Sequence, residues 1–437
     1  MNIFPNYILL VACLFFISLN SKADIFAYIP DHVGVQNQHG LLHVVNASYD
    51  VKVETIELFG NPRDIYINKT GDTVFVSTEV EDDGEEESYI NLIDTSTNKR
   101  VGLIAVEQGS FVRGMAMNST ESKLYVTHDR GVTEISNPYS LDPQLKEFTT
   151  NYRGTSLVIS NDDQYLFVLG QDGNGVDGIS LISFDDAIND EIRTGLRLGS
   201  GKGASSIIYL DLENELYVTN RGSDELVLLE VQNYADPLQA DLNLVDTLRF
   251  EDGASPSDIV YDEEHDELLV SLSFILDERD STGNGYIAVL NAFDFHQQPA
   301  RGLSKIFLWD EGGIDNVFDP IHPTAISLDE FGSIHVIKHI WNEHTGMYLA
   351  RLKDSTNNGI RTVQEAKSVK LGEQSATLIS GTFIGPDCSS CPTGLDHNPN
   401  EETKRPSSMD FQTIAMLLVV LLIGAGMRRF GKNYHIR

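Results

Sequence analysis

Short apolar runs separated by polar turns recur along this chain of 437 residues. Each copy of the pattern has an apolar triplet, a polar turn, and a second run that reads Leu-Tyr-Val-Thr or close to it. In five copies the second run begins nine positions after the first, and the sixth copy is one residue shorter. Runs of β-branched and aromatic residues that flank a polar turn predict a β-hairpin. The six copies begin at Ile65, Met115, Leu157, Ile207, Ile259 and Ile326.

Further strand-like runs follow the hairpins, and four strands in ~40–50 residues is the period of a β-propeller blade. The two ends of the repeat region complement each other. The N-terminal end has three strand-like runs without an opening strand, and residues 375–380 form an opening strand without a sequel. We therefore predict an all-β fold, a seven-bladed propeller over residues 24–386. A composite blade, in which residues 376–380 pair with the N-terminal strands, would close the ring and leave no exposed sheet edge.

Two of the repeated runs carry a family resemblance. Residues 124–127 (Leu-Tyr-Val-Thr) and 216–220 (Leu-Tyr-Val-Thr-Asn) resemble the YVTN-type repeat of seven-bladed propellers in exported bacterial and archaeal proteins. That repeat belongs to a wider group with lactonase-like and cytochrome-d1-type propellers. The resemblance covers most of residues 60–340 and implies the fold. It implies little about activity, because propellers host enzymes, ligand-binding proteins and scaffolds alike.

The N-terminus has the features of a signal peptide over residues 1–23. An apolar run extends from Ile8 to Leu19, and small residues precede Asp24. A lipoprotein signal with its cleavage box ending at Cys13 is the alternative.

The C-terminal part divides into three segments. Residues 387–410 are rich in Pro, Asn, Glu and Ser and predict a polar stalk. Residues 411–427 are mostly apolar and predict a transmembrane helix or a sorting tail. The positive-inside rule places the basic tail at 428–437 in the cytoplasm. We therefore expect a periplasmic or cell-surface propeller that is anchored in the membrane by its C-terminal helix.

The exported part is strongly acidic. All 65 acidic residues lie between positions 24 and 410, whereas five of the 31 basic residues lie outside that segment, so its formal charge is about −39. Such a surface repels nucleic acid, and DNA or RNA is not expected as a partner. Solubility outside the cell and a cationic partner are both compatible with this charge.

Two further features point to cation or disulfide chemistry. Asp172, Asn174 and Asp177 alternate with glycines and form a weak candidate for a calcium site, although a hairpin turn explains the same residues. Cys388 and Cys391 lie in the predicted stalk. Cysteine pairs usually oxidise outside the cytoplasm, so we expect a disulfide there, and a zinc site is the alternative. No cofactor is expected.

Three arginines form the main candidate site. Arg63 and Arg113 lie two residues before the first apolar residue of their hairpins, and Arg153 lies four residues before it. Consecutive blades would bring these residues to the mouth of the central channel. Because a guanidinium group binds carboxylate or phosphate through two hydrogen bonds, the expected ligand is anionic. The alternative is that each arginine pairs with a carboxylate of a neighbouring blade.

The same end of the predicted ring also receives Arg221, His128 and His322, with further histidines between His339 and His344. Histidines from different blades can bind a metal or act as a general base. Each is equally compatible with a structural role, and the chain has no nucleophile elbow, phosphate loop or His-Glu-x-x-His motif. We therefore expect a non-catalytic module that binds a protein partner or a small anion at the channel mouth. The alternative is an enzyme of the lactonase or dehydrogenase-like propeller type.

Overall fold

The structure of this chain is a computed structural model. It describes residues 24–31, 39–82, 85–106, 112–184, 191–211, 214–236, 239–273, 285–292, 304–307, 321–328, 333–340, 346–357, 360–372 and 382–384. The chain divides by its contacts into Met1–Gly394 and Leu395–Arg437, and all described residues belong to the first unit.

Several predicted features lie outside the described residues. These are the signal peptide at 1–23, the stalk at 387–410 with Cys388 and Cys391, the apolar segment at 411–427 and the basic tail at 428–437. Within the described part of the chain, no helix has the length and the hydrophobicity that crossing a bilayer requires.

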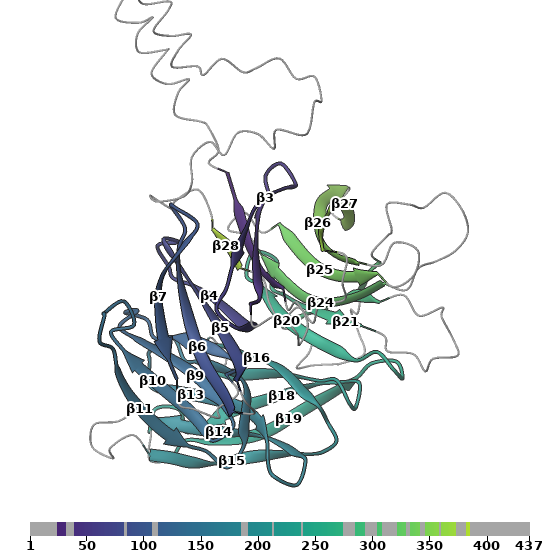
Figure 1. Cartoon of the computed structure of the whole chain (residues 1–437). Helices are drawn as coiled ribbons and strands as arrows, with labels where there is room; N and C mark the ends of the chain where they lie inside the picture. The colour runs from purple at the N-terminus through teal and green to yellow at the C-terminus, as the bar shows by residue number, and fades with distance from the viewer. Residues whose placement is uncertain are drawn as a thin grey trace, which may run out of the picture. The chain divides into compact units, whose positions relative to one another are not determined.

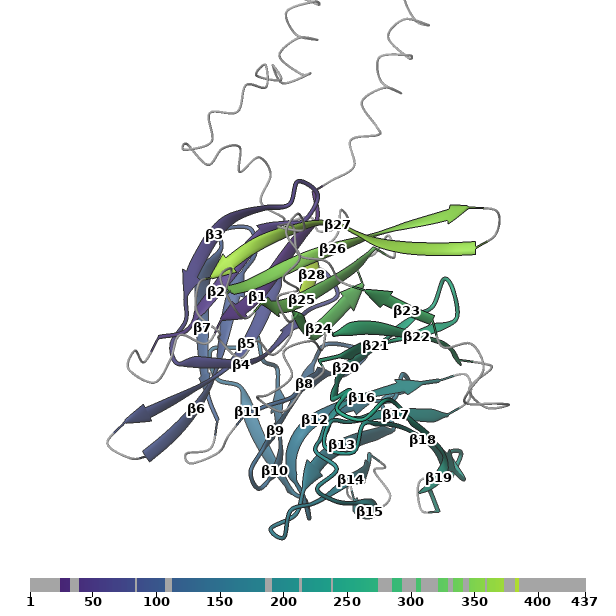
Figure 2. The same cartoon turned by 90° about the vertical axis from the view of Figure 1, so that its right-hand side faces the viewer.

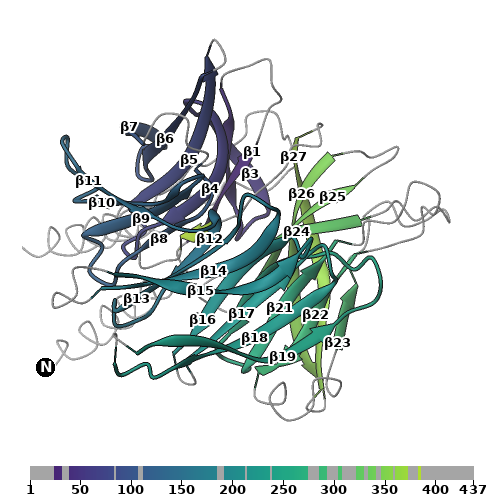
Figure 3. The same ribbon diagram turned by 90° about the horizontal axis from the view of Figure 1, so that it is seen from below.

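The described strands form seven four-stranded antiparallel sheets, and Figures 1 and 3 show these sheets arranged as the blades of a propeller. This confirms the predicted all-β, seven-bladed fold. Six sheets are continuous in sequence. Their strands are β4 (Asn61–Ile67), β5 (Thr73–Asp82), β6 (Glu85–Asp94), β7 (Lys99–Ala105); β8 (Met115–Met117), β9 (Lys123–His128), β10 (Gly131–Ser136), β11 (Gln144–Thr149); β12 (Arg153–Ile159), β13 (Tyr165–Gln171), β14 (Val176–Ser183), β15 (Glu191–Ser200); β16 (Ala204–Leu210), β17 (Glu215–Asn220), β18 (Glu225–Gln232), β19 (Asp241–Arg249); β20 (Pro256–Asp262), β21 (Glu267–Leu272), β22 (Tyr286–Asn291), β23 (Ser304–Phe307); and β24 (Ile321–Leu328), β25 (Ile334–Ile340), β26 (Gly346–Asn357), β27 (Ile360–Gly372). Figure 2 shows that β26 and β27 continue as a long two-stranded ribbon.

The seventh sheet combines both ends of the propeller region, as predicted. Its strands are β1 (Phe26–Asp31), β2 (Leu41–Asn46), β3 (Val51–Glu57) and β28 (Thr382–Ile384). Phe26 is the partner of Ile384 in the antiparallel pair of β1 and β28. The closing strand is therefore residues 382–384 rather than the predicted 376–380, which lie outside the described residues. A contact between sheets supports the closure, because the Lys52 ammonium donates a hydrogen bond of 3.0 Å to the Leu371 carbonyl oxygen.

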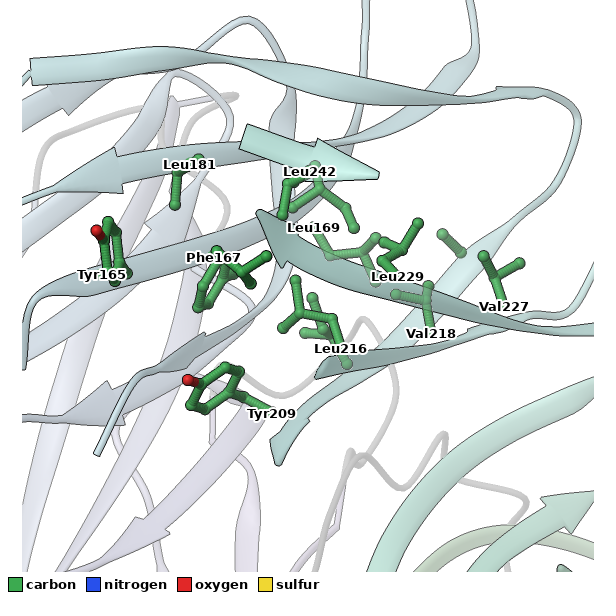
Figure 4. Close-up of a cluster of buried hydrophobic side chains, with 14 of the residues drawn as sticks. Tyr165, Phe167, Leu169, Leu181, Tyr209, Leu216, Val218, Val227, Leu229 and Leu242 are labelled. Atoms are coloured by element: carbon green, nitrogen blue, oxygen red, sulfur yellow. The ribbon is translucent and has the colours of Figure 1, made fainter. Parts of the chain in front are cut away.

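The hydrophobic core lies between neighbouring blades. Each second strand is apolar on both faces, so it packs against the blades on either side. Figure 4 shows Phe167 and Leu169 of β13 close to Leu216 and Val218 of β17. Tyr217 of the same strand faces the other way, into the cluster shared with β20 and β21. Alternate residues of β17 therefore contribute to two adjacent cores, which explains why Leu216, Tyr217 and Val218 form an unbroken apolar run.

Candidate functional site

The first strand of each sheet is the inner strand of its blade, and these strands contact one another around the ring. Near the start of an inner strand the pairing with the second strand contains a β-bulge. In β16 the bulge falls at Ser205, and in β20 it falls at Ser257. Because all inner strands run in the same direction, their starts lie at one end of the ring. We call this end the channel-mouth end.

Arg63 occupies the bulge position of β4 and is already paired. Its Nη2 and Nε atoms both lie 2.7 Å from Oε2 of Glu79, and Glu79 is almost fully buried. The alternative reading expected pairing with a carboxylate of a neighbouring blade, whereas Glu79 lies on β5 of the same blade as Arg63. Arg63 is therefore not available to a ligand without breaking that pair.

Arg113 corresponds to Arg63 in the second blade. Its backbone N–H donates to the Thr127 carbonyl oxygen, and the N–H of Gly114 donates to Thr127 Oγ1 at 2.8 Å. The same arrangement follows the bulge in β16, where Ser206 N–H donates to Thr219 Oγ1. The Arg113 side chain is exposed, and it too has an interaction partner within the chain.

Arg153 is also exposed, and it lies at the first position of β12 opposite Gln171. The bulge of β12 falls two residues later, at Thr155. Arg153 is therefore at the channel-mouth end, as predicted, but not at the same register position as Arg63 and Arg113.

Arg221 directly follows β17, at the channel-mouth end of the fourth blade. Its backbone N–H donates to the Gly203 carbonyl oxygen at 3.0 Å, which fixes the turn beside the start of β16. Within the described part of the chain, no ion pair involves Arg221, whereas its neighbour Lys202 is paired with Glu225 at 2.7 Å. Surrounding protein lowers the pKa of the Arg221 guanidinium by desolvation, although the side chain is exposed. A cation in such surroundings gains more from an anion than one in open water does.

His128 is buried and fully engaged. Its Nε2 atom lies 2.9 Å from Oε2 of Glu147, and its Nδ1 atom accepts a hydrogen bond of 3.2 Å from the Arg130 backbone N–H. Burial tends to raise the pKa of Glu147, but hydrogen bonds from His128 and Thr133 outweigh it and lower that pKa. Glu147 belongs to β11, the outermost strand of its blade. His128 lies on β9, next to the inner strand β8, and its side chain links β9 to the outermost strand of the sheet.

His322 lies near the start of β24, at the channel-mouth end of the sixth blade. The register of β24 and β25 places it directly opposite His339. The enzyme alternative from the sequence expected His128, His322 or His339 to lie near one another or near a carboxylate, and the register pairs two of these three.

The calcium candidate is explained by turn formation. The Asp172 carboxylate accepts hydrogen bonds from the backbone N–H groups of Asn174 and Val176, at 2.8 and 2.9 Å. The carboxylate of Asp177 accepts one of 2.9 Å from the Gly203 N–H in the next blade. Among the described residues, no group of three or more His, Cys, Asp or Glu side chains is placed to hold a metal ion. These bonds give both carboxylates a structural role.

Sequence reasoning missed a cavity at the opposite end of the ring. It has a volume of about 760 Å³ and lies between the first two continuous blades, beside their first turns. Two asparagines fix these turns in the same way: Asn68 Oδ1 accepts from the N–H of Thr73, and Asn118 Oδ1 accepts from that of Lys123. The recurrence of asparagine at both turns is the sequence signal that could have pointed to paired turns here.

Comparison with known proteins supports the fold and no finer relationship. No family model matches the sequence, and no curated protein matches it. Solved structures do match. The periplasmic gluconolactonase PpgL of Pseudomonas aeruginosa and a candidate 6-phosphogluconolactonase of Bacteroides uniformis each have a TM-score of 0.57 and 12% identity, with 83% of this chain and 99% of theirs covered. A protein from Lactobacillus plantarum has a TM-score of 0.56 and 10% identity, with 83% and 100% covered. At this identity the likeness shows a shared seven-bladed propeller fold.

Proposed function

We propose that this protein is an exported, membrane-anchored propeller that binds a small anionic ligand at the channel-mouth end. One observation carries the proposal. Arg221 is exposed at the channel-mouth end and has no ion-pair partner among the described residues. Arg153 lies at the same end of the preceding blade and offers a second exposed guanidinium group.

The nature of the ligand follows from the guanidinium group. Its planar N–H donors match a carboxylate or a phosphate, and the group has no hydrogen-bond acceptor. Export and anchoring remain proposals that rest on the apolar segments at both ends of the sequence. Membership of the YVTN-type repeat group also remains a proposal, which the repeated Leu-Tyr-Val-Thr runs support.

The test is anion binding by the full-length protein. Gluconate and 6-phosphogluconate serve as probes, and isothermal titration calorimetry measures their affinity. Arg221→Gln is expected to weaken binding of the preferred probe about tenfold, which corresponds to about 1.4 kcal/mol. Arg249→Gln is the matched control, because Arg249 lies on the outer strand of the same blade and pairs with Asp252. The absence of binding by the wild type, or equal binding by Arg221→Gln, would reject the proposal.

A second candidate function is lactone hydrolysis. The observation in its favour is the register that sets His322 opposite His339 at the channel-mouth end, where a general base would be needed. The similarity in fold to PpgL suggests glucono-δ-lactone as the first substrate to assay. An enzyme should hydrolyse it faster than buffer does, and both His322→Ala and His339→Ala should abolish the excess rate. A wild-type rate equal to that of buffer excludes this substrate.

A further inference from the structure

The cavity between the first two continuous blades lies at the end of the ring opposite the channel mouth. It is bordered by the turn after β4, the turn after β8, and the connection between β6 and β7. Inner strands end here, so this site shares no residues with the proposed anion site. Its volume of about 760 Å³ is large enough for one or two amino-acid side chains together with water.

The lining of the cavity is acidic. It includes the carboxylates of Asp72, Asp94 and Glu121, and it includes no lysine, arginine or histidine. One oxygen of each carboxylate is held by a local donor: Asn68 Nδ2 for Asp72, Ser96 Oγ for Asp94, and the Lys69 backbone N–H for Glu121. These bonds fix the direction of the carboxylates without neutralising their charge.

Two described lysines belong to these turns, Lys69 and Lys123, and neither lines the cavity; the Lys123 ammonium is paired with Glu134 at 3.1 Å. The Lys69 ammonium donates a hydrogen bond of 2.6 Å to the Ser119 carbonyl oxygen, and Lys69 does not line the cavity. The pKa values of two tyrosines near these turns, Tyr66 and Tyr139, are raised, and burial is the main cause for both. Burial, together with the negative charge of Glu121, raises the pKa of Tyr66 to about 12, and burial is also the main cause that raises the pKa of Tyr139 to about 12.

Exposed apolar side chains adjoin this acidic cavity. Val101 and Tyr139 line it, and both are large hydrophobic residues with about half or more of their surface exposed. Leu103 lies two positions beyond Val101 on β7, and Leu141 lies two positions beyond Tyr139 in the connection from β10 to β11. Leu141 is fully exposed, and Leu103 is exposed as well. We call Val101, Leu103, Tyr139 and Leu141 the apolar rim.

The position of β7 makes the apolar rim accessible to a partner. β7 is the outer strand of its sheet, so one of its edges has no neighbouring strand within that sheet. Exposed apolar residues on an edge strand favour association with another chain, and a monomeric protein normally avoids them. Such an edge promotes aggregation unless a partner protein covers it.

We propose that the acidic cavity and the apolar rim together form a docking surface for a segment of a partner protein that carries a lysine or arginine flanked by apolar residues. The basic side chain enters the cavity and meets the carboxylates of Asp72, Asp94 and Glu121. The flanking apolar side chains cover the rim on both sides of it. Charge complementarity selects this occupant, because the lining repels an anionic or acidic segment.

The experiment uses random dodecapeptides displayed on phage, which are panned against the full-length protein. The enriched peptides are synthesised, and fluorescence anisotropy measures their affinities. We expect the enriched sequences to contain Lys or Arg next to apolar residues. We expect Glu121→Gln and Leu141→Ser each to weaken their binding at least fivefold. Glu121→Gln keeps an oxygen for the Lys69 N–H, and Leu141 is fully exposed, so neither change should impair folding.

Two controls separate this surface from other sites. Leu244→Ser removes an exposed leucine of similar type from the outer strand of the fourth blade and should leave peptide affinity unchanged. Arg221→Gln should also leave it unchanged, because the anion site lies at the other end of the ring. The proposal is overturned if no peptide is enriched, if the enriched peptides lack basic residues, or if either test variant weakens binding less than fivefold.

Discussion

Asp258 Oδ2 accepts a hydrogen bond of 3.1 Å from the backbone N–H of Ile326, which lies on the inner strand of the next blade. Its Oδ1 atom accepts one of 3.0 Å from Ser206 Oγ on the inner strand of the preceding blade. One carboxylate therefore joins three consecutive inner strands. Asp64 makes the equivalent bond to the N–H of Met115, at 2.8 Å. Because backbone groups in the middle of a propeller need partners, these aspartates hold the blades in register around the channel.

The Asp258 carboxylate should make stability depend on pH. Burial raises its pKa in the folded state. The folded protein then keeps this proton to a higher pH than the unfolded chain does, so the contribution of Asp258 to stability falls as the pH rises from about 4 through the raised pKa. Asp258→Asn cannot titrate. We expect the difference in unfolding free energy, wild type minus variant, to fall with pH by at most about 1.4 kcal/mol per pH unit in this window.

Urea unfolding at several pH values measures this difference. Asp252→Asn is the control variant, because it makes the same substitution at an exposed carboxylate. Parallel pH profiles for the wild type and Asp258→Asn would show that the group does not titrate in this window.

The Arg63–Glu79 pair should be structural. Removal of the guanidinium group by Arg63→Gln takes the ion pair away from the nearly buried Glu79 carboxylate. We expect a loss of about 1–3 kcal/mol in unfolding free energy and no change in anion affinity. Glu79→Gln in the same background should recover part of the loss, and Arg249→Gln, at an exposed pair, should cost less than 1 kcal/mol. Additive losses in the double variant would mean that the two side chains do not interact.

The fold followed from the sequence because its signals are local. Runs such as residues 216–218 are apolar at consecutive positions, since they pack on two neighbouring blades, and similar runs recur along the chain. The closing strand was misplaced by a few residues. Residues 376–380 are more strand-like than 382–384, yet pairing with Phe26 depends on the three-dimensional path of the chain and not on strand propensity.

The site was harder to predict. The register of Arg63 and Arg113 was visible in the sequence, but the partner of Arg63 was not, because Glu79 lies sixteen residues away on the next strand. The histidines illustrate the same limit. In the sequence, His128 had the same position at the end of a second strand as Asn220 has in another blade. In the structure its side chain contacts Glu147, which lies nineteen residues away on the outer strand of the same sheet. Which polar residues are paired is decided by contacts between strands.

The His128–Glu147 contact should contribute to stability above acidic pH only. The lowered pKa of Glu147 means that its stabilising effect is present above the ordinary pKa of a glutamate, about 4.3, and is lost as the pH falls through the lowered value. Glu147 is 40% exposed, so solvent screens the interaction. We expect Glu147→Gln to cost about 0.5–1 kcal/mol at pH 7 and nothing at a pH below the lowered pKa. Thermal unfolding at both pH values measures this, and an equal cost at both would contradict it.

Truncation distinguishes between the two assignments of the closing strand. A chain that ends at residue 380 lacks β28 but keeps residues 376–380, whereas a chain that ends at residue 386 keeps both segments. Without β28 the inner edge of β1 is unpaired, and such an edge favours association. We expect the shorter chain to be less stable by about 2 kcal/mol and to aggregate with increasing concentration, as measured by urea unfolding and light scattering. Equal behaviour of the two chains would instead favour closure by residues 376–380.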